Sequence, residues 1–564
     1  MSEATSTPGS VSRRDSASTS AYTTVRSLLD AGDGAAPAIG APGRPFLDYA
    51  GLRAHVDRTV EALNALGVGR GDRVAIVLDN GPEMASAFLS IANAATTAPL
   101  NPSYRRQEYD FYLEDLGAKA LVVAEDSESE AIDSARAFGA EVIRLRVPDG
   151  APAGVFELAA EKGFEPGAGA GPGQGPAAPG QGSPAPGDAA TASEQGDPTR
   201  PGQRAAARPG PAEADDVALV LHTSGTTSRP KIVPLLHRNL CASAHNIRAT
   251  LCLTPEDRCL NVMPLFHIHG LMAPVLSSLS TGACVVCTPG FNVLKFYAWL
   301  DEAEPTWYSA VPTMHQALLA RAQRNRDSVE RASLRFIRSA SSSLPPQVLA
   351  ELEETFGAPV VEAYAMTEAS HQMTCNQLPP GVRKPGTVGC AAGPEVAVMD
   401  EVGNLLGVGE TGEIVIRGPN VTPGYENNPE ANAKAFTNGW FRTGDQGVMD
   451  EDGYVTLTGR LKEIINRGGE KISPKEVDEV FMDHPAVQQV CTFAVPHDKL
   501  GEEVAAAVVL REGAAATSAE LRDFVAERLA EFKVPRTVLL MDEIPKGPTG
   551  KLRRIGLAEQ LGIG

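Results

Sequence analysis

The sequence predicts an α/β protein of at least two domains, and three observations carry that prediction. Apolar residues at helical spacing, as in 57–66, alternate with short apolar runs at 73–78 and 120–124, which are typical of buried parallel strands. A chain of 564 residues is too long for one hydrophobic core. After residue 459 a compact mixture of helical and strand patterns predicts a separate small α+β domain.

The elements of the C-terminal part follow one another at short intervals. The run GYVTLTG predicts a strand that ends at Gly459. Beyond it we expect a helix at 475–482, strands at 488–495 and 505–510, and a helix at 518–529. The expected organisation is an N-terminal domain over 23–458 and a C-terminal domain over 459–564.

Two segments have too few apolar side chains to join a core. Residues 1–22 are expected to form a disordered tail, and they have no apolar run of the kind that marks a secretory signal. Residues 166–187 consist only of Gly, Pro, Ala, Gln and Ser, which predicts an unstructured linker at about 165–214. This linker interrupts the N-terminal domain, because the α/β pattern resumes at Val217.

Composition excludes some functions and says little about others. The net charge of -20 argues against nonspecific binding to nucleic acid or to an anionic membrane. No apolar stretch approaches the length that spans a bilayer. Of the eight cysteines only Cys284 and Cys287 lie close together, in an apolar run that predicts a buried strand, so we expect reduced thiols and a cytoplasmic location.

A polar turn after the apolar strand that begins near Ala218 is the most informative local signal. It contains Thr223, Ser224, Gly225, Thr226 and Thr227, followed by Lys231. Hydroxyls, backbone N–H groups and a cation are what a polyphosphate needs. The spacing differs from the Walker pattern, and Thr-Ser-Gly alone would indicate a surface turn.

With the whole string ALVLHTSGTTSRPKIVPL, the chain resembles the adenylate-forming superfamily of acyl-CoA synthetases, nonribosomal-peptide adenylation domains and firefly luciferase. Ser228 stands where that family usually has glycine. The resemblance continues at EAYAMTE (362–368), with Ala365 for the usual glycine. It implies that Tyr364 stacks on adenine, Thr367 touches phosphate and Glu368 holds Mg²⁺, a hard cation that prefers carboxylate oxygens.

Three further motifs follow in the family's order. In GWFRTGD, Asp445 would accept both ribose hydroxyls, and Arg460 would assist it. Lys462 falls at the hinge position, and Gly468, Gly469, Glu470 and Lys471 resemble the loop that lines the pantetheine tunnel of coenzyme A. In PKGPTGK, Lys551 would reach the α-phosphate and the attacking carboxylate. By the same likeness Ser341, Glu362 and Ala363 contact the nucleotide, and Thr226, Glu368 and Lys551 are the catalytic residues.

The fold and mechanism that this resemblance implies are specific. A large N-terminal domain of α/β and β subdomains carries a small, mobile C-terminal lid that rotates at Lys462. A carboxylic acid attacks the α-phosphorus of ATP, pyrophosphate leaves, and Lys551 then swings out as the Gly468–Lys471 loop moves in for thiol attack. The expected cofactors are ATP, Mg²⁺ and coenzyme A. Because no carrier domain follows Lys551, the thiol is expected to be free coenzyme A, and the oligomeric state stays open.

The segments around the acyl site resemble oxalate–CoA ligases. They include MPLFHIHGL, YSAVPTMHQ and FIRS, in which Ala340 and Ser342 depart from that group's Cys-Ser-Ala-Ser string. We expect His267, His269, Ser342 and His371 in the acyl pocket, with Ser341, Ser343 and His315 as further donors, since a second carboxylate needs donors or cations when it leaves water. His267 could instead gate the thiol, and any one of these histidines could be structural. The alternatives are a medium- or long-chain fatty acyl-CoA ligase, a ligase for another small acid, a luciferase-like oxygenase and a nonenzymatic adenylate binder.

Overall fold

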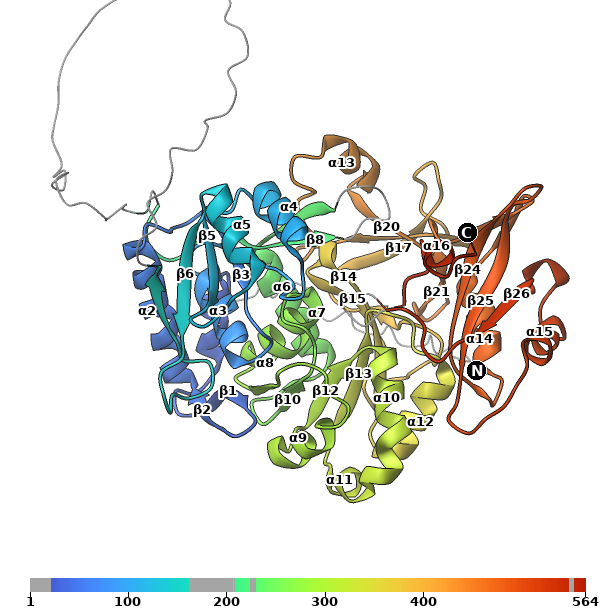
Figure 1. Cartoon of the computed structure of the whole chain (residues 1–564), viewed down its shortest axis with the longest axis horizontal. Helices are drawn as coiled ribbons and strands as arrows, with labels where there is room; N and C mark the ends of the chain where they lie inside the picture. Colours follow the sequence, from blue (N-terminus) through green and yellow to red (C-terminus); the bar gives the residue numbers. More distant parts are fainter. Residues whose placement is uncertain (1–21, 162–205, 207, 224–229, 547–551, 564) are drawn as a thin grey trace, which may run out of the picture.

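The computed structural model describes residues 22–161, 206, 208–223, 230–546 and 552–563 (Figure 1). Within them the strands form four β-sheets, three in the N-terminal part and one in the C-terminal part. The predicted α/β class is confirmed. Apart from Tyr22, the predicted tail lies outside the described residues, as does most of the predicted linker.

The first sheet of the N-terminal part has seven strands in the order β7-β6-β5-β3-β4-β8-β9, and its central strands are parallel. They are β3 (Arg73–Val77), β4 (Thr96–Pro99), β5 (Ala120–Ala124), β6 (Glu141–Arg146), β7 (Glu157–Ala160), β8 (Val217–Thr223) and β9 (Lys231–Leu236). The accompanying helices are α1 (Val25–Leu28), η1 (Leu29–Ala31), α2 (Tyr49–Ala65), α3 (Pro82–Ala92), α4 (Arg106–Leu116), α5 (Glu130–Phe138) and α6 (His237–Thr250). The predicted strands 73–78 and 120–124 are β3 and β5.

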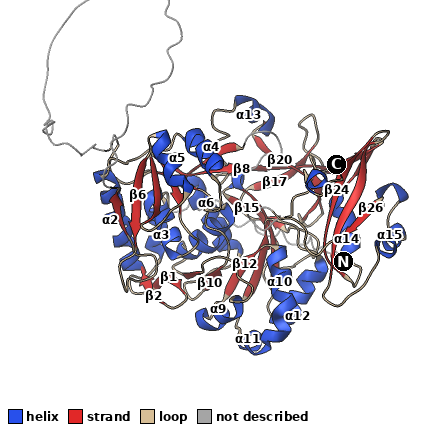
Figure 2. Cartoon of the chain, viewed as in Figure 1, coloured by secondary structure: helices blue, strands red, loops and turns tan. Residues whose placement is uncertain are grey.

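The second sheet has nine strands in the order β16-β15-β14-β13-β12-β10-β11-β1-β2. They are β1 (Pro37–Ala41), β2 (Arg44–Asp48), β10 (Arg258–Asn261), β11 (Cys284–Cys287), β12 (Trp307–Ala310), β13 (Phe336–Ala340), β14 (Val360–Met366), β15 (His371–Cys375) and β16 (Cys390–Ala391). Its helices are α7 (Ile268–Gly270), the π-helix η2 (Leu271–Leu276), α8 (Ser277–Leu279), α9 (Phe296–Ala303), α10 (Pro312–Ala322), η3 (Gln323–Asn325), α11 (Arg326–Arg331), α12 (Pro346–Phe356) and η4 (Thr367–Ala369). Helices α10 and α12 pack against each other beside it (Figure 2).

A five-stranded sheet, mainly antiparallel, completes the N-terminal part, and a second one forms the C-terminal part. The former contains β17 (Glu395–Met399), β18 (Thr411–Arg417), β19 (Phe436–Thr437), β20 (Trp440–Met449) and β21 (Val455–Arg460), with helix α13 (Pro429–Ala435). The latter contains β22 (Ile465–Arg467), β23 (Glu470–Ile472), β24 (Val487–His497), β25 (Gly501–Leu510) and β26 (Thr537–Leu540), with α14 (Pro474–Met482), α15 (Ser518–Ala526), η5 (Glu531–Lys533) and α16 (Leu557–Gln560). In Figure 1 this C-terminal sheet stands at the right of the molecule.

The C-terminal end of the predicted linker contacts the N-terminal part. At residues 208–214 the carbonyl of Arg208 accepts the Arg70 N–H at 2.9 Å and the N–H of Ala212 donates to Asn93 at 2.8 Å. Gly69 permits this contact, because a Cβ there would lie 2.6 Å from the Arg208 carbonyl oxygen. These hydrogen bonds fix the chain as it enters β8.

A search for membrane-spanning helices among the described residues finds none that is both long and apolar enough.

Candidate active site

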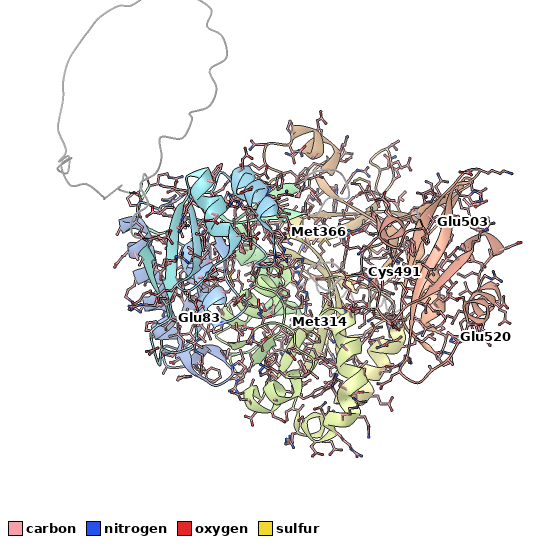
Figure 3. The ribbon with its side chains drawn as sticks, viewed as in Figure 1. Glu83, Met314, Met366, Cys491, Glu503 and Glu520 are labelled. Atoms are coloured by element: carbon pink, nitrogen blue, oxygen red, sulfur yellow. The ribbon has the colours of Figure 1, made fainter. Side chains whose placement is uncertain are left out.

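A cavity of about 320 Å³ lies between the N-terminal part and the C-terminal sheet. The predicted site residues on its wall are Ser341, Ser342, Glu362, Ala363, Tyr364, Asp445 and Arg460. The C-terminal part contributes Lys475, Asp478, Gln489, Leu552 and Arg554. In Figure 3, Met366 marks the end of β14 and Cys491 marks β24, two of the elements that line the cavity from its two sides.

Tyr364, Asp445 and Arg460 meet although they come from three different strands. Asp445 on β20 pairs in register with Arg460 on β21, whose Nε donates to the Asp445 carboxylate at 2.8 Å. The Tyr364 hydroxyl on β14 donates to the other carboxylate oxygen. Burial and the neighbouring carboxylate raise the pKa of Tyr364 well above its usual value, so its hydroxyl stays protonated. The group offers a ring face and a buried bidentate acceptor at one wall of the cavity.

Glu368 and Lys231 form a second group. Glu368 lies in η4, directly after β14. Its side chain is buried, and its carboxylate accepts a hydrogen bond from the Tyr425 hydroxyl at 2.8 Å. Burial raises its pKa, and the charges of Lys231 and Arg460 oppose that rise. Burial and the positive charge of Lys462 lower the pKa of Lys231, whose Nζ lies 4.2 Å from the centre of the Tyr425 ring. Half-buried Thr367 precedes Glu368, and Thr223 ends β8 opposite Lys231.

Glu368 suits a magnesium ion that takes its other ligands from ATP. Mg²⁺ is usually held by one or two carboxylates together with phosphate oxygens and waters. Among the residues that the structure describes, no group of three or more His, Cys, Asp or Glu side chains is placed to hold an ion. Glu368 is a buried carboxylate that could provide such a ligand.

The loop after β13 connects the cavity to a buried polar cluster. Ser341 has a left-handed backbone, with φ of 75°, and its Oγ lies 3.0 Å from His269 Nδ1. His269 Nε2 lies 2.7 Å from Ser309 Oγ, and the His269 ring stacks on His371 with 4.9 Å between ring centres. His371 has a φ of 98°, a strained value that its surroundings must hold in place.

Only some of the residues predicted for the acyl pocket line the cavity. Of its four predicted residues, Ser342 lines the cavity, whereas His269 and His371 are buried behind Ser341. His267 is half-buried, and its Nδ1 accepts the His269 N–H at 3.2 Å. His315 does not line the cavity: it is buried on α10 against the Tyr308 hydroxyl, 3.3 Å away, and burial lowers its pKa to about 3. Ser343, in contrast, lies on the cavity wall.

The glycine loop and hinge lie outside the cavity wall. Gly468 and Gly469 form the turn between β22 and β23 with φ of 61° and 99°, values that favour glycine. Glu470 and Lys471 are exposed on β23, and Lys462 is exposed just after β21. The face of the C-terminal part that meets the cavity instead carries Leu552 and Arg554. Ser224, Gly225, Thr226, Thr227 and Lys551 lie outside the described residues.

Several residues at the site were not expected from the sequence. Tyr425 donates to Glu368, and Arg554 forms ion pairs with Asp478 at 2.6 Å and with Glu463 at 3.3 Å beside the cavity. The sequence could have indicated Arg554, because it follows the predicted catalytic Lys551 by only three residues. Tyr425 gave no comparable signal, because a lone tyrosine after Pro-Gly is common in loops.

Comparisons with known proteins agree with this geometry. Residues 33–426 match the family model "AMP-binding enzyme", and residues 476–551 match "AMP-binding enzyme C-terminal domain". The chain is 42% identical over 522 residues to the oxalate–CoA ligase of Arabidopsis thaliana, covering 92% of this chain and 94% of that one. It is 43% identical over 500 residues to the oxalate–CoA ligase of Saccharomyces cerevisiae, covering 87% of each.

The fold of the chain is also similar to that of a solved structure. ATP-bound MatB from Rhodopseudomonas palustris matches with a TM-score of 0.79 at 29% identity, covering 95% of this chain and 98% of that one. The chain belongs to the AMP-binding enzyme family. The membership predicted from five ordered motifs is thereby confirmed, and the relatives that match over most of their length are CoA ligases.

Proposed function

We propose that this protein is an AMP-forming oxalate–CoA ligase, which converts oxalate, ATP and coenzyme A into oxalyl-CoA, AMP and pyrophosphate. The observation that carries the choice of acid is the polar cluster of His269, Ser309, Arg338 and His371 directly behind Ser341 at the cavity wall. A fatty acyl chain would gain free energy from an apolar lining, whereas a small dianion needs donors and positive charge. The two oxalate–CoA ligases named above support the same choice.

In the first half-reaction the acid's carboxylate attacks the α-phosphorus of ATP and pyrophosphate leaves. Asp445 accepts the ribose hydroxyls, displacing the Tyr364 hydroxyl from its carboxylate, and the Tyr364 ring packs on adenine. Lys231 and Lys551 neutralise charge on the phosphates, with Thr223, Ser224, Gly225, Thr226, Thr227 and Thr367 as hydrogen-bonding groups. Mg²⁺ held at Glu368 would supply further charge neutralisation when bound. The presence of Leu552 and Arg554 at the cavity supports this half-reaction as the state of the structure.

In the second half-reaction a thiol attacks the acyl carbon and AMP leaves. Gly468, Gly469, Glu470 and Lys471 lie away from the cavity in this state, so they must move to contact coenzyme A. Rotation at Lys462 would bring them in and take Lys551 out. One cleft then serves two chemical steps in turn.

The test is a panel of acids assayed with ATP, Mg²⁺ and coenzyme A, with AMP and thioester both measured. Oxalate should give a higher kcat/KM than malonate, acetate, octanoate or palmitate. Octanoate or palmitate exceeding oxalate would indicate a fatty acyl-CoA ligase, and absence of AMP with every acid would indicate a nonenzymatic adenylate binder. His269→Ala and His371→Ala should raise the KM for oxalate far more than the KM for ATP; an equal rise would assign these histidines to the fold.

A further inference from the structure

Arg338 is a buried cation without a carboxylate partner among the described residues. It lies on β13, next to Ser309 of β12 in the sheet register, and its side chain is fully buried. No ion pair within 4.0 Å joins it to any described Asp or Glu, although its neighbour Arg335 pairs with Asp257 at 2.8 Å. Burial lowers the pKa of Arg338 to about 10, so it remains a cation at neutral pH.

The described groups that contact the guanidinium include no carboxylate. Nη2 donates to Gln372 Oε1 at 3.1 Å, and Nη1 lies 3.4 Å from Ser309 Oγ and 3.5 Å from His269 Nε2. Nε has no hydrogen-bond partner within the part of the chain that the structure describes. A buried charge is costly unless an opposite charge or enough hydrogen bonds compensate it, and these contacts are long. The site therefore has positive charge to spare for an anion.

Hydrogen-bond direction connects this charge to the cavity. A guanidinium only donates, and Arg338 Nη1 lies 3.5 Å from His269 Nε2, so the tautomer of His269 that fits Arg338 has Nε2 unprotonated. The Ser309 hydroxyl, 2.7 Å away, then donates to Nε2 and accepts from Arg338. That leaves the His269 proton on Nδ1, where it donates to Ser341 Oγ at 3.0 Å. Ser341 lines the cavity, so its hydroxyl proton is available to an anion there. Each link of the chain orders the next one.

We propose that Arg338 is the positioning residue that makes the acyl site specific for an acid with a second carboxylate. It orders the Ser309–His269–Ser341 chain and supplies the buried positive charge behind it. This inference rests on the proposed ligase function and extends it. After adenylation one carboxylate of oxalate is joined to the α-phosphate as a mixed anhydride while the other stays anionic, so the charge of Arg338 is needed throughout the first half-reaction. An acid with a neutral second group gains nothing from it.

The experiment compares oxalate with oxamate, which replaces the second carboxylate by an amide of nearly the same size. Wild-type enzyme should prefer oxalate in kcat/KM. Arg338→Met should lower kcat/KM for oxalate by about 30-fold or more, mainly through KM, because one partner of a buried charge interaction is lost. The same variant should change the oxamate value and the KM for ATP only a few-fold. Arg338→Lys should restore most of the oxalate preference.

Arg335→Met is the matched control, since it removes a neighbouring arginine that already has a carboxylate partner. It should lower stability without changing the oxalate-to-oxamate ratio. If Arg338→Met keeps the wild-type ratio, the Arg338 proposal is wrong while the ligase function stands. If Arg338→Met does not fold, the test is the kcat/KM of wild-type enzyme for the two acids. Equal values for oxalate and oxamate would overturn the proposal. Wild-type enzyme that activates acetate but not oxalate would overturn the proposed function itself.

Discussion

Replacing Glu362 with glutamine should stabilise the protein at alkaline pH and leave its stability unchanged in mild acid. Glu362 lies on β14 with 3% of its surface exposed, and one carboxylate oxygen accepts the Leu344 N–H at 2.9 Å. Burial raises its pKa from 4.5 to about 7; the Leu344 N–H and the charge of Lys475 oppose the rise. Glutamine keeps an acceptor for Leu344 and cannot ionise.

The sign and size of the effect follow from proton linkage. Because the pKa of Glu362 is higher in the folded state, the folded state binds the proton more tightly than the unfolded chain does. The contribution of Glu362 to stability is therefore fully present below pH 4.5, falls as pH rises to about 7, and levels off above that. A shift from 4.5 to about 7 corresponds to a loss of about 3 kcal/mol at pH 8. Glu362→Gln should recover up to that amount at pH 8 and almost none at pH 4.5.

The assay is urea unfolding of the nucleotide-free protein at pH 4.5, 6 and 8, followed by tryptophan fluorescence. Trp307 lies on β12 of the same sheet as Glu362 and reports its unfolding. Glu353→Gln is the control, since Glu353 also accepts a backbone N–H, from Val360 at 2.8 Å, but pairs with Arg383. It should not stabilise the protein at any pH. A difference between wild type and Glu362→Gln that stays constant from pH 4.5 to 8 would refute the reasoning.

Three other perturbations test the remaining assignments. Asp445→Asn should raise the KM for ATP by roughly 10- to 100-fold in a pyrophosphate-release assay, because hydrogen bonds to a charged acceptor are worth about 1.5–3 kcal/mol; an unchanged KM would remove Asp445 from the ribose site. Lys551→Ala should abolish adenylation yet convert supplied acyl-adenylate to thioester, and equal loss of both steps in a folded variant would contradict lid alternation. Deleting residues 166–187 should leave turnover within a few-fold, since loop length costs little free energy; a large drop in the melting temperature would show that the segment packs against the domain.

Much of the fold could be predicted from local patterns, and the errors have local causes. The apolar run at 120–124 coincides with β5, because a buried strand needs continuous apolar residues on both faces. The helix expected at 57–66 is α2, which begins earlier, at Tyr49. The Asp48 side chain accepts the Gly51 N–H at 2.6 Å and starts the helix before its apolar periodicity becomes regular.

In the candidate site, too, motifs predicted individual residues, whereas the contacts between them depend on the fold. Motifs identified Asp445 and Arg460 individually, but only the β20–β21 register shows that they are direct cross-strand partners. Arg338 belongs to the segment FIRS, which resembles oxalate–CoA ligases, but the sequence alone assigned it no role, because burial of a lone arginine depends on how distant elements cover it. The histidines of the predicted acyl pocket show the limit of the approach. The sequence pattern grouped His269, His315 and His371. All three are buried, but the fold stacks only His269 on His371, whereas His315 lies on α10 against Tyr308.

The charged side chains on and beside β13 and β14 differ in what compensates them, and that difference separates structural from ligand-binding roles. Arg335 and Asp257 neutralise each other within the chain. Arg338 has no carboxylate partner among the described residues, and Glu362 relieves its burial by holding a proton near neutral pH. An arginine cannot take that second route at physiological pH. The charge of Arg338 is separated from the cavity only by His269 and Ser341 and has no counterion among the described residues. It is therefore most stable when the cavity contains an anion. A doubly charged small acid provides that anion while it presents its other carboxylate to ATP.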